Sequence, residues 1–84
     1  MTTYQTIAAR HILETLAGVN SGVEKKTLFE IAEAGSAEPL TTCEQNEVWA
    51  ILTGKGWIRI RLNAAEKPLA FITAAGSAAI EDLR

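Results

Sequence analysis

Residues 52–62 read LTGKGWIRIRL, and residues 69–76 read LAFITAAG. The first stretch ends a helical pattern with two closely spaced glycines and then alternates between two faces, as a half-buried strand does. The second stretch reads as a returning strand that leads through Thr73-x-x-Gly76 into another helix. A helix, a glycine stop, a hairpin and a closing helix therefore follow one another, and this order decides the fold.

Length and composition favour one small domain over residues 1–84. The chain has 84 residues, of which 48% are hydrophobic, and this suffices for a single modest core. One cysteine excludes an internal disulfide and leaves too few ligands for a structural zinc site, so a reducing cytoplasm is the expected compartment. The apolar runs are too short to span a membrane, and the first residues lack a signal-peptide pattern. We expect a soluble protein without a metal or other cofactor.

Helical spacing of apolar residues predicts two helices in the first half of the chain. One covers residues 3–17, with Thr2 or Thr3 as its cap, and the other covers residues 23–34. The first has Tyr4, Ile7, Ala8, Ile12, Leu13 and Leu16 on its apolar face, and the second is expected to bury Leu28, Ile31 and Ala32. Gly35 is placed as a C-cap, and residues 36–40, which include Pro39, form a short connector.

A third helix follows this connector and runs to the glycines at 54 and 56. Thr41 stands three residues before Glu44, and Thr42 three before Gln45, so either threonine can form a capping box. The inward face of this helix is predicted to consist of Val48, Ile51 and Leu52. Three short helices in this order, with a tight connector between the second and third, make a helix-turn-helix plausible.

The hairpin is predicted from strands at 57–62 and 69–73, joined by a polar turn at 63–68. Along the first strand Ile58, Ile60 and Leu62 point to one face, and Trp57, Arg59 and Arg61 point to the other. Residues 77–83 then form a short amphipathic helix with an apolar side made of Ala79, Ile80 and Leu83.

These motifs carry a family resemblance. The run Leu52-x-x-x-Gly56-Trp57-Ile58, the hairpin, and Ile72-Thr73-x-x-Gly76 with Ile80 and Leu83 after it resemble the C-terminal portion of MarR-like, PadR-like and ArsR-like winged-helix transcription regulators. The resemblance covers roughly the last 35 to 40 residues, while the first three helices agree in order and length only. It implies an α+β winged helix-turn-helix fold of three helices, a β-hairpin wing and a short C-terminal helix. It also implies that the third helix enters the major groove of DNA and that the wing touches the backbone or minor groove.

Carried onto this sequence, the resemblance places the groove-facing side of the third helix opposite its apolar side. A step of about 100° per residue puts Asn46, Ala50 and Thr53 there, with Thr42 and Trp49 at the margin. Asn46 can read adenine with two hydrogen bonds, and threonines can contact phosphates or base edges. However, residues 41–54 contain no lysine or arginine, and Glu44 and Glu47 repel phosphate. The third helix therefore departs from the family pattern, which supplies arginine for base reading.

The basic residues concentrate in the wing. The net charge is −2, yet four of the eight basic residues lie between positions 55 and 68: Lys55, Arg59, Arg61 and Lys67. A pair of arginines on one strand face, flanked by lysines, can grip backbone phosphates even on an acidic protein. The alternative is that these are ordinary solvated charges on the outer face of a strand.

No set of residues in the sequence indicates catalysis, so a non-enzyme is expected. Cys43 reads as a small buried or half-buried residue and His11 as a packed or solvated one, although a thiol near the start of a helix can also act as a redox sensor. The first functional hypothesis is a DNA-binding transcription regulator of bacterial or phage type, expected to act as a homodimer because one reading helix gives little specificity. The second is a winged-helix protein-interaction module without DNA binding.

Two tryptophans bear on that second hypothesis. Trp49 and Trp57 read as core residues with a wet edge. If they are exposed beside Leu69 or Phe71, the patch indicates a surface for a protein partner or a second copy of the chain. The register of the hairpin decides between these readings.

Overall fold

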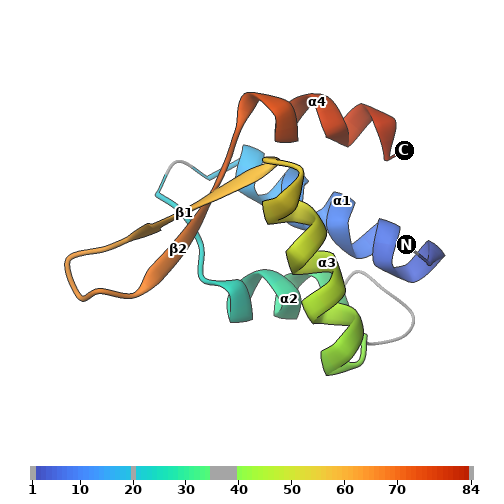
Figure 1. Ribbon diagram of the computed structural model, residues 1–84, viewed down its shortest axis with the longest axis horizontal. Coiled ribbons are helices and arrows are strands. Elements are labelled where there is room, and N and C mark those ends of the chain that lie inside the picture. The colour runs from blue at the N-terminus through green and yellow to red at the C-terminus, as the bar shows by residue number, and fades with distance from the viewer. Residues whose placement is uncertain (1, 20, 35–39, 84) are drawn as a thin grey trace.

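The computed structural model describes residues 2–19, 21–34 and 40–83. Its elements follow one another as three helices, a hairpin and a fourth helix (Figure 1). They are α1 (Thr3–Ala17), α2 (Lys25–Ala34), α3 (Thr42–Gly54), β1 (Ile58–Leu62), β2 (Pro68–Ile72) and α4 (Ala74–Asp82). The predicted α+β winged helix-turn-helix order is confirmed.

Side-chain caps fix where the helices begin. Thr2 caps α1 and Thr41 caps α3, and in each case the residue three positions on, Gln5 or Glu44, bonds back to the backbone N–H of the threonine. These are complete capping boxes, which satisfy backbone donors that a helix start otherwise leaves free. The predicted bounds of α1 and the Thr41 capping box are thus confirmed. The predicted cap at Gly35 and most of the 36–40 connector lie outside the described residues.

The core lies where α1 packs against α2, α3 and α4. Its fully buried large side chains are Ile12, Leu13, Leu16, Leu28, Val48 and Leu52. Ile58 at the root of β1 and Ile80 on α4 close the core from the hairpin side. Gln5 is the one polar residue among the buried described side chains, and its amide donates to Glu47 Oε2 at 3.0 Å, which ties α1 to α3.

Two predictions about α2 are wrong. The helix begins at Lys25 rather than at Val23, because the backbone of Val23 pairs with Ala70 of β2 through bonds of 3.1 and 2.8 Å. Ile31 is 43% exposed, and Phe29 is buried in its place. The helix therefore turns a different face to the core from the one that the apolar pattern suggested.

The hairpin extends beyond the core. β1 and β2 are antiparallel, with Ile58 opposite Ile72 at the root and Leu62 opposite Pro68 near the tip. Of the three residues predicted to share the inner face of β1, only Ile58 is buried, whereas Ile60 is 41% exposed and Leu62 is 67% exposed. The expectation of a half-buried strand is wrong for these last two, because no helix of the described chain covers the far end of the wing (Figure 1).

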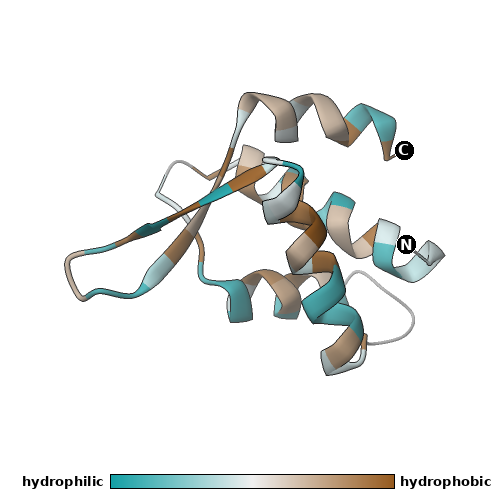
Figure 2. Ribbon diagram, viewed as in Figure 1, coloured by the Kyte–Doolittle hydropathy of each residue, from teal (hydrophilic) through white to brown (hydrophobic). Residues whose placement is uncertain are grey.

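β1 is the outer strand of this small sheet. β2 pairs with β1 on one side and with the Val23 bridge on the other, so the second edge of β1 is left without a neighbouring strand in the described chain. Figure 2 shows hydrophobic and hydrophilic residues alternating along β1.

Thr73 and Gly76 join the root of the wing to α4. The Thr73 hydroxyl lies 2.6 Å from the Gly56 carbonyl oxygen, to which it donates, and accepts a bond from the Gly76 N–H at 3.1 Å. The Thr73 N–H donates to the Trp57 carbonyl oxygen at 3.0 Å. As a result α4 starts at Ala74, three residues before the predicted start at Ser77. The strands also shift slightly from their predicted bounds, to 58–62 and 68–72.

We expect Gly76→Ala to destabilise the protein. A Cβ at this position would collide with the Trp57 carbonyl oxygen and would lie 3.0 Å from Ile72 Cγ1. Overpacking against backbone typically costs about 1–3 kcal/mol, more than the helix propensity that alanine adds. Urea unfolding should therefore show a free energy of unfolding lower by about 2 kcal/mol. Ser77→Ala, at the next and exposed position of α4, is the matched control. Equal stability of the two variants would contradict the close packing at Gly76.

Candidate nucleic-acid interface

The outward face of α3 carries the residues that the helical rotation predicted. Thr42, Asn46, Ala50 and Thr53 are exposed. The Thr53 hydroxyl donates within the helix, to the carbonyl oxygens of Trp49 (2.9 Å) and Ala50 (3.2 Å), so it has only acceptor capacity left for a ligand. On this face Asn46 and Thr42 are therefore the exposed polar side chains that can donate as well as accept.

A lysine from α2 supplies the positive charge that α3 lacks. Lys25 is the first residue of α2, and its ammonium donates to Asn46 Oδ1 at 3.2 Å. The same ammonium lies 5.6 Å from the centre of the Trp49 ring, at a distance typical of a cation–π contact. Since Oδ1 has a second lone pair, Asn46 keeps one acceptor site and both amide donors for a ligand.

Sequence reasoning missed Lys25, because it looked for basic residues on the third helix itself. The signal was the pair Lys25-Lys26 at the start of the second helix. In the structure the first residue of α2 lies beside α3, which brings one of these two lysines to Asn46.

Trp49 is half-buried and forms one wall of an apolar hollow. Its ring centre lies 6.1 Å from that of Phe29, with the planes tilted by 52°. The hollow has a volume of about 100 Å³ and lies between α2, α3 and the wing, where it is lined by Lys25, Trp49, Ile60, Pro68 and Ala70. One face of the wing thus looks toward α3 and is apolar.

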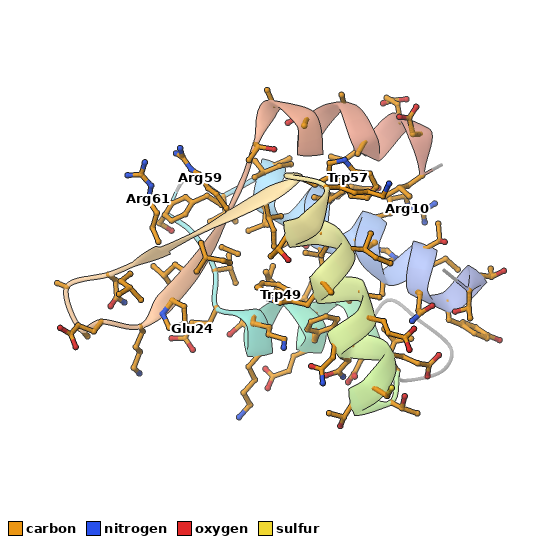
Figure 3. The ribbon with its side chains drawn as sticks, in the orientation of Figure 1. Arg10, Glu24, Trp49, Trp57, Arg59 and Arg61 are labelled. Atoms are coloured by element: carbon orange, nitrogen blue, oxygen red, sulfur yellow. The ribbon has the colours of Figure 1, made fainter. Side chains whose placement is uncertain are left out.

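The opposite face of the wing holds the arginines. The register places Arg59 across from Phe71 and Arg61 across from Leu69, and the Arg59 guanidinium lies 6.0 Å from the centre of the Phe71 ring. Figure 3 shows both arginine side chains above the wing, while Trp49 lies below β1. Arg59 and Arg61 are exposed, and neither forms an ion pair with another residue of the described chain. The wing therefore separates the two arginines from the surface formed by Lys25 and Asn46.

The register also resolves the predicted aromatic patch. Trp57 is half-buried against the core, with Lys55 Nζ 5.6 Å from its ring centre. Leu69 and Phe71 are half-buried on the arginine face, and Phe71 packs so closely on Gly22 (φ 76°) that a Cβ there would lie 2.7 Å from its ring. Trp49 lies on the other side of the wing. The prediction that both tryptophans pack against the core with one edge exposed is confirmed. Trp49, Trp57, Leu69 and Phe71 form no single exposed patch.

The tip of the wing is braced by one asparagine. Asn63 Oδ1 accepts from the backbone N–H groups of Ala65 (2.9 Å) and Lys67 (3.0 Å), and the main chain of Asn63 bonds to Glu66 and Lys67. Glu66 adopts φ 60°, in the left-handed region that disfavours most side chains. The predicted polar turn is thus a defined structure that holds the exposed Lys67 at its end.

Cys43 and His11 are not part of this surface. Cys43 is exposed, with Sγ 3.7 Å from Glu47 Oε1, so the expectation that it is at least half-buried is wrong. The helix turns this position to solvent while Val48 and Leu52 face inward. His11 is half-buried in α1. Within residues 2–19, 21–34 and 40–83, no three His, Cys, Asp or Glu side chains gather as a metal site would require, and no helix is long and apolar enough to cross a bilayer.

Three helices, a two-stranded wing and a closing helix define the class: a winged helix-turn-helix domain. No protein-family model and no curated protein matches the sequence. The structure is similar to the crystal structure of SSV1 F-93, with a TM-score of 0.70 and 16% sequence identity, over 99% of this chain and 83% of that one. At this identity the likeness concerns the fold. The narrower resemblance to MarR-like, PadR-like and ArsR-like regulators stays a prediction.

The strained residue at the wing tip gives a stability prediction. Asparagine tolerates positive φ better than glutamate, so Glu66→Asn should raise the free energy of unfolding by about 0.5 kcal/mol. Glu66→Gln is the matched control, because it removes the same charge and leaves the backbone strain. Urea unfolding of both variants measures the difference. If Asn and Gln give the same stability, any change comes from the charge and not from the backbone.

Proposed function

We propose that this protein is a DNA-binding regulator in which α3 lies in or near the major groove and the wing contacts the phosphate backbone. The observation that carries the proposal is the Lys25–Asn46 pair. It sets a cation beside an exposed amide on the helix face that winged-helix proteins turn toward DNA. Lysine neutralises phosphate, and asparagine can bond to adenine N6 and N7. The winged-helix fold and its likeness to SSV1 F-93 are consistent with the proposal.

The wing contributes a second set of cations. Arg59, Arg61 and Lys67 are exposed, and Lys55 stands at its root. Because the arginines lie on the face turned away from α3, they reach the backbone at a place distinct from the Lys25 contact. Thr42, Asn46 and Thr53 on α3, with Lys55, Arg59, Arg61 and Lys67, remain the predicted contact residues, and Lys25 joins them. A homodimer would double these contacts on a two-fold symmetric site.

The salt dependence of DNA binding tests this proposal. Each phosphate contact contributes a slope of about −0.9 to the plot of log affinity against log salt concentration. Replacing Arg59 and Arg61 together by alanine should reduce the slope by about 2, and Lys25→Ala should reduce it by about 1. Fluorescence anisotropy on a labelled random-sequence duplex, at several salt concentrations, measures both.

The matched control is Arg10→Ala, which removes a cation from α1 whose Nε already lies 3.4 Å from Glu14 Oε1. Its slope should equal that of the wild type. Absence of DNA binding at low salt would rule the proposal out. If the variant with both Arg59 and Arg61 replaced by alanine keeps the wild-type slope, the wing arginines do not contact DNA and Lys25 remains as the phosphate contact.

A second candidate function is a winged-helix protein-interaction module that binds no DNA. The exposed apolar residues Ile60 and Leu62 favour it, as do the carboxylates of Glu44 and Glu47 on α3. The same titration separates the two functions, because a module of this kind would not bind duplex DNA at low salt.

A further inference from the structure

The most exposed large apolar side chain in the described chain lies where the proposed function needs polar contacts. Leu62 is 67% exposed at the end of β1, and its cross-strand neighbour Pro68 is also exposed. Side chains directly opposite one another in an antiparallel pair lie about 5 Å apart, so the two form one apolar ridge. Leu62 belongs neither to the described core nor to the lining of the hollow, whereas Pro68 borders the hollow that Lys25 and Trp49 also line.

Each residue of the ridge follows a cation in the chain, and the ridge is carried on a stiff support. Arg61 precedes Leu62 and Lys67 precedes Pro68, and strand alternation turns Arg61 to the face of the wing opposite to Leu62. The bonds that Asn63 Oδ1 accepts from the backbone N–H groups of Ala65 and Lys67 hold the turn that joins the strands. Beyond the ridge the tip consists of residues 63–67, which include the small side chains of Ala64 and Ala65 and the exposed carboxylate of Glu66.

An apolar ridge on a rigid hairpin whose other face carries arginines has the chemistry of a side-chain wedge for the minor groove of duplex DNA. Proteins that bend DNA from the minor groove insert leucine, isoleucine or proline at a base step, while basic residues hold the adjoining phosphates. Insertion partly unstacks the step and kinks the duplex toward the major groove. The groove is about 6 Å wide in relaxed DNA, so a two-stranded ribbon enters it only if it is opened in this way.

We propose that the Leu62–Pro68 ridge is a wedge that enters the minor groove beside the α3 site and kinks the DNA. This inference rests on the proposed function, since it assigns a role to the wing in the same complex. A wedge of this kind favours flexible pyrimidine–purine steps such as TA and CA, and disfavours stiff A-tracts. The wedge thereby makes the protein prefer DNA that is easily deformed at the base step it enters, although the protein forms no hydrogen bond to a base there.

The experiment measures DNA bending directly. A duplex of about 30 base pairs, labelled at its ends for energy transfer, is titrated with the wild-type protein and with Leu62→Ala and Leu62→Gln. We expect the wild type to shorten the end-to-end distance more on duplexes with a central TA step than on an A-tract. Both variants should lose most of the bend and about tenfold in affinity, and the salt slope should not change because no cation is removed.

Val19→Ala is the matched control, because Val19 is another exposed apolar residue, 37% accessible, in the turn after α1. It should bend DNA as the wild type does. Urea unfolding of each variant shows that a lost bend does not reflect a lost fold, and since Leu62 is largely exposed we expect all of them to remain folded.

The outcomes separate the wedge from the DNA-binding proposal. If the wild type binds DNA without bending it, or if Leu62→Ala bends it fully, the wedge is wrong and DNA binding stands. If no duplex binds at low salt, both proposals fall. If sedimentation shows a dimer that Leu62→Ala dissociates, the ridge is an interface between two copies of the chain and the wedge is again wrong.

Discussion

The structure depends on the close contact between Gly76 and the carbonyl group of Trp57. The glycine lets the start of α4 lie against the root of β1, where no side chain fits. Thr73 adds its hydroxyl and its N–H to the same place, and so fixes the chain leaving β2 relative to the chain entering β1. The direction in which the wing leaves the core is set at this junction. The Val23–Ala70 bridge fixes β2 at a second place, and the two contacts together position the wing relative to α3.

The wing is held at its root and by the Val23–Ala70 bridge, and the chemistry of its two faces differs. The face toward α3 is apolar and, together with Trp49 and Lys25, lines the hollow. The other face carries Arg59 and Arg61 over Phe71 and Leu69. Strand alternation makes this division unavoidable, since successive residues point to opposite sides. β1 therefore presents apolar side chains on the face toward α3 and arginines on the opposite face.

Local patterns were sufficient to predict the element order, because each boundary has its own signal. The capping box at Thr41, the glycines after α3 and the alternation in β1 all act over a few residues. Contacts between distant segments leave no such signal. The pairing of Val23 with Ala70 shortens α2, and only the packing of α2 beside α3 brings Lys25 to Asn46. The burial of β1 was also overestimated, because alternation shows which residues share a face but not whether another element covers it.

The edge of β1 that no strand of the described residues covers has a consequence for the protein at high concentration. An uncovered edge strand can recruit a second copy by antiparallel pairing, which is a common start of aggregation. When two copies of β1 pair in antiparallel orientation, residues directly opposite each other lie on the same face of the sheet. Every such register that overlaps three or more residues of β1 therefore sets an arginine directly opposite an arginine. Like charges facing each other oppose the pairing. Arg59 and Arg61 thereby oppose self-association of the protein through the uncovered edge of β1.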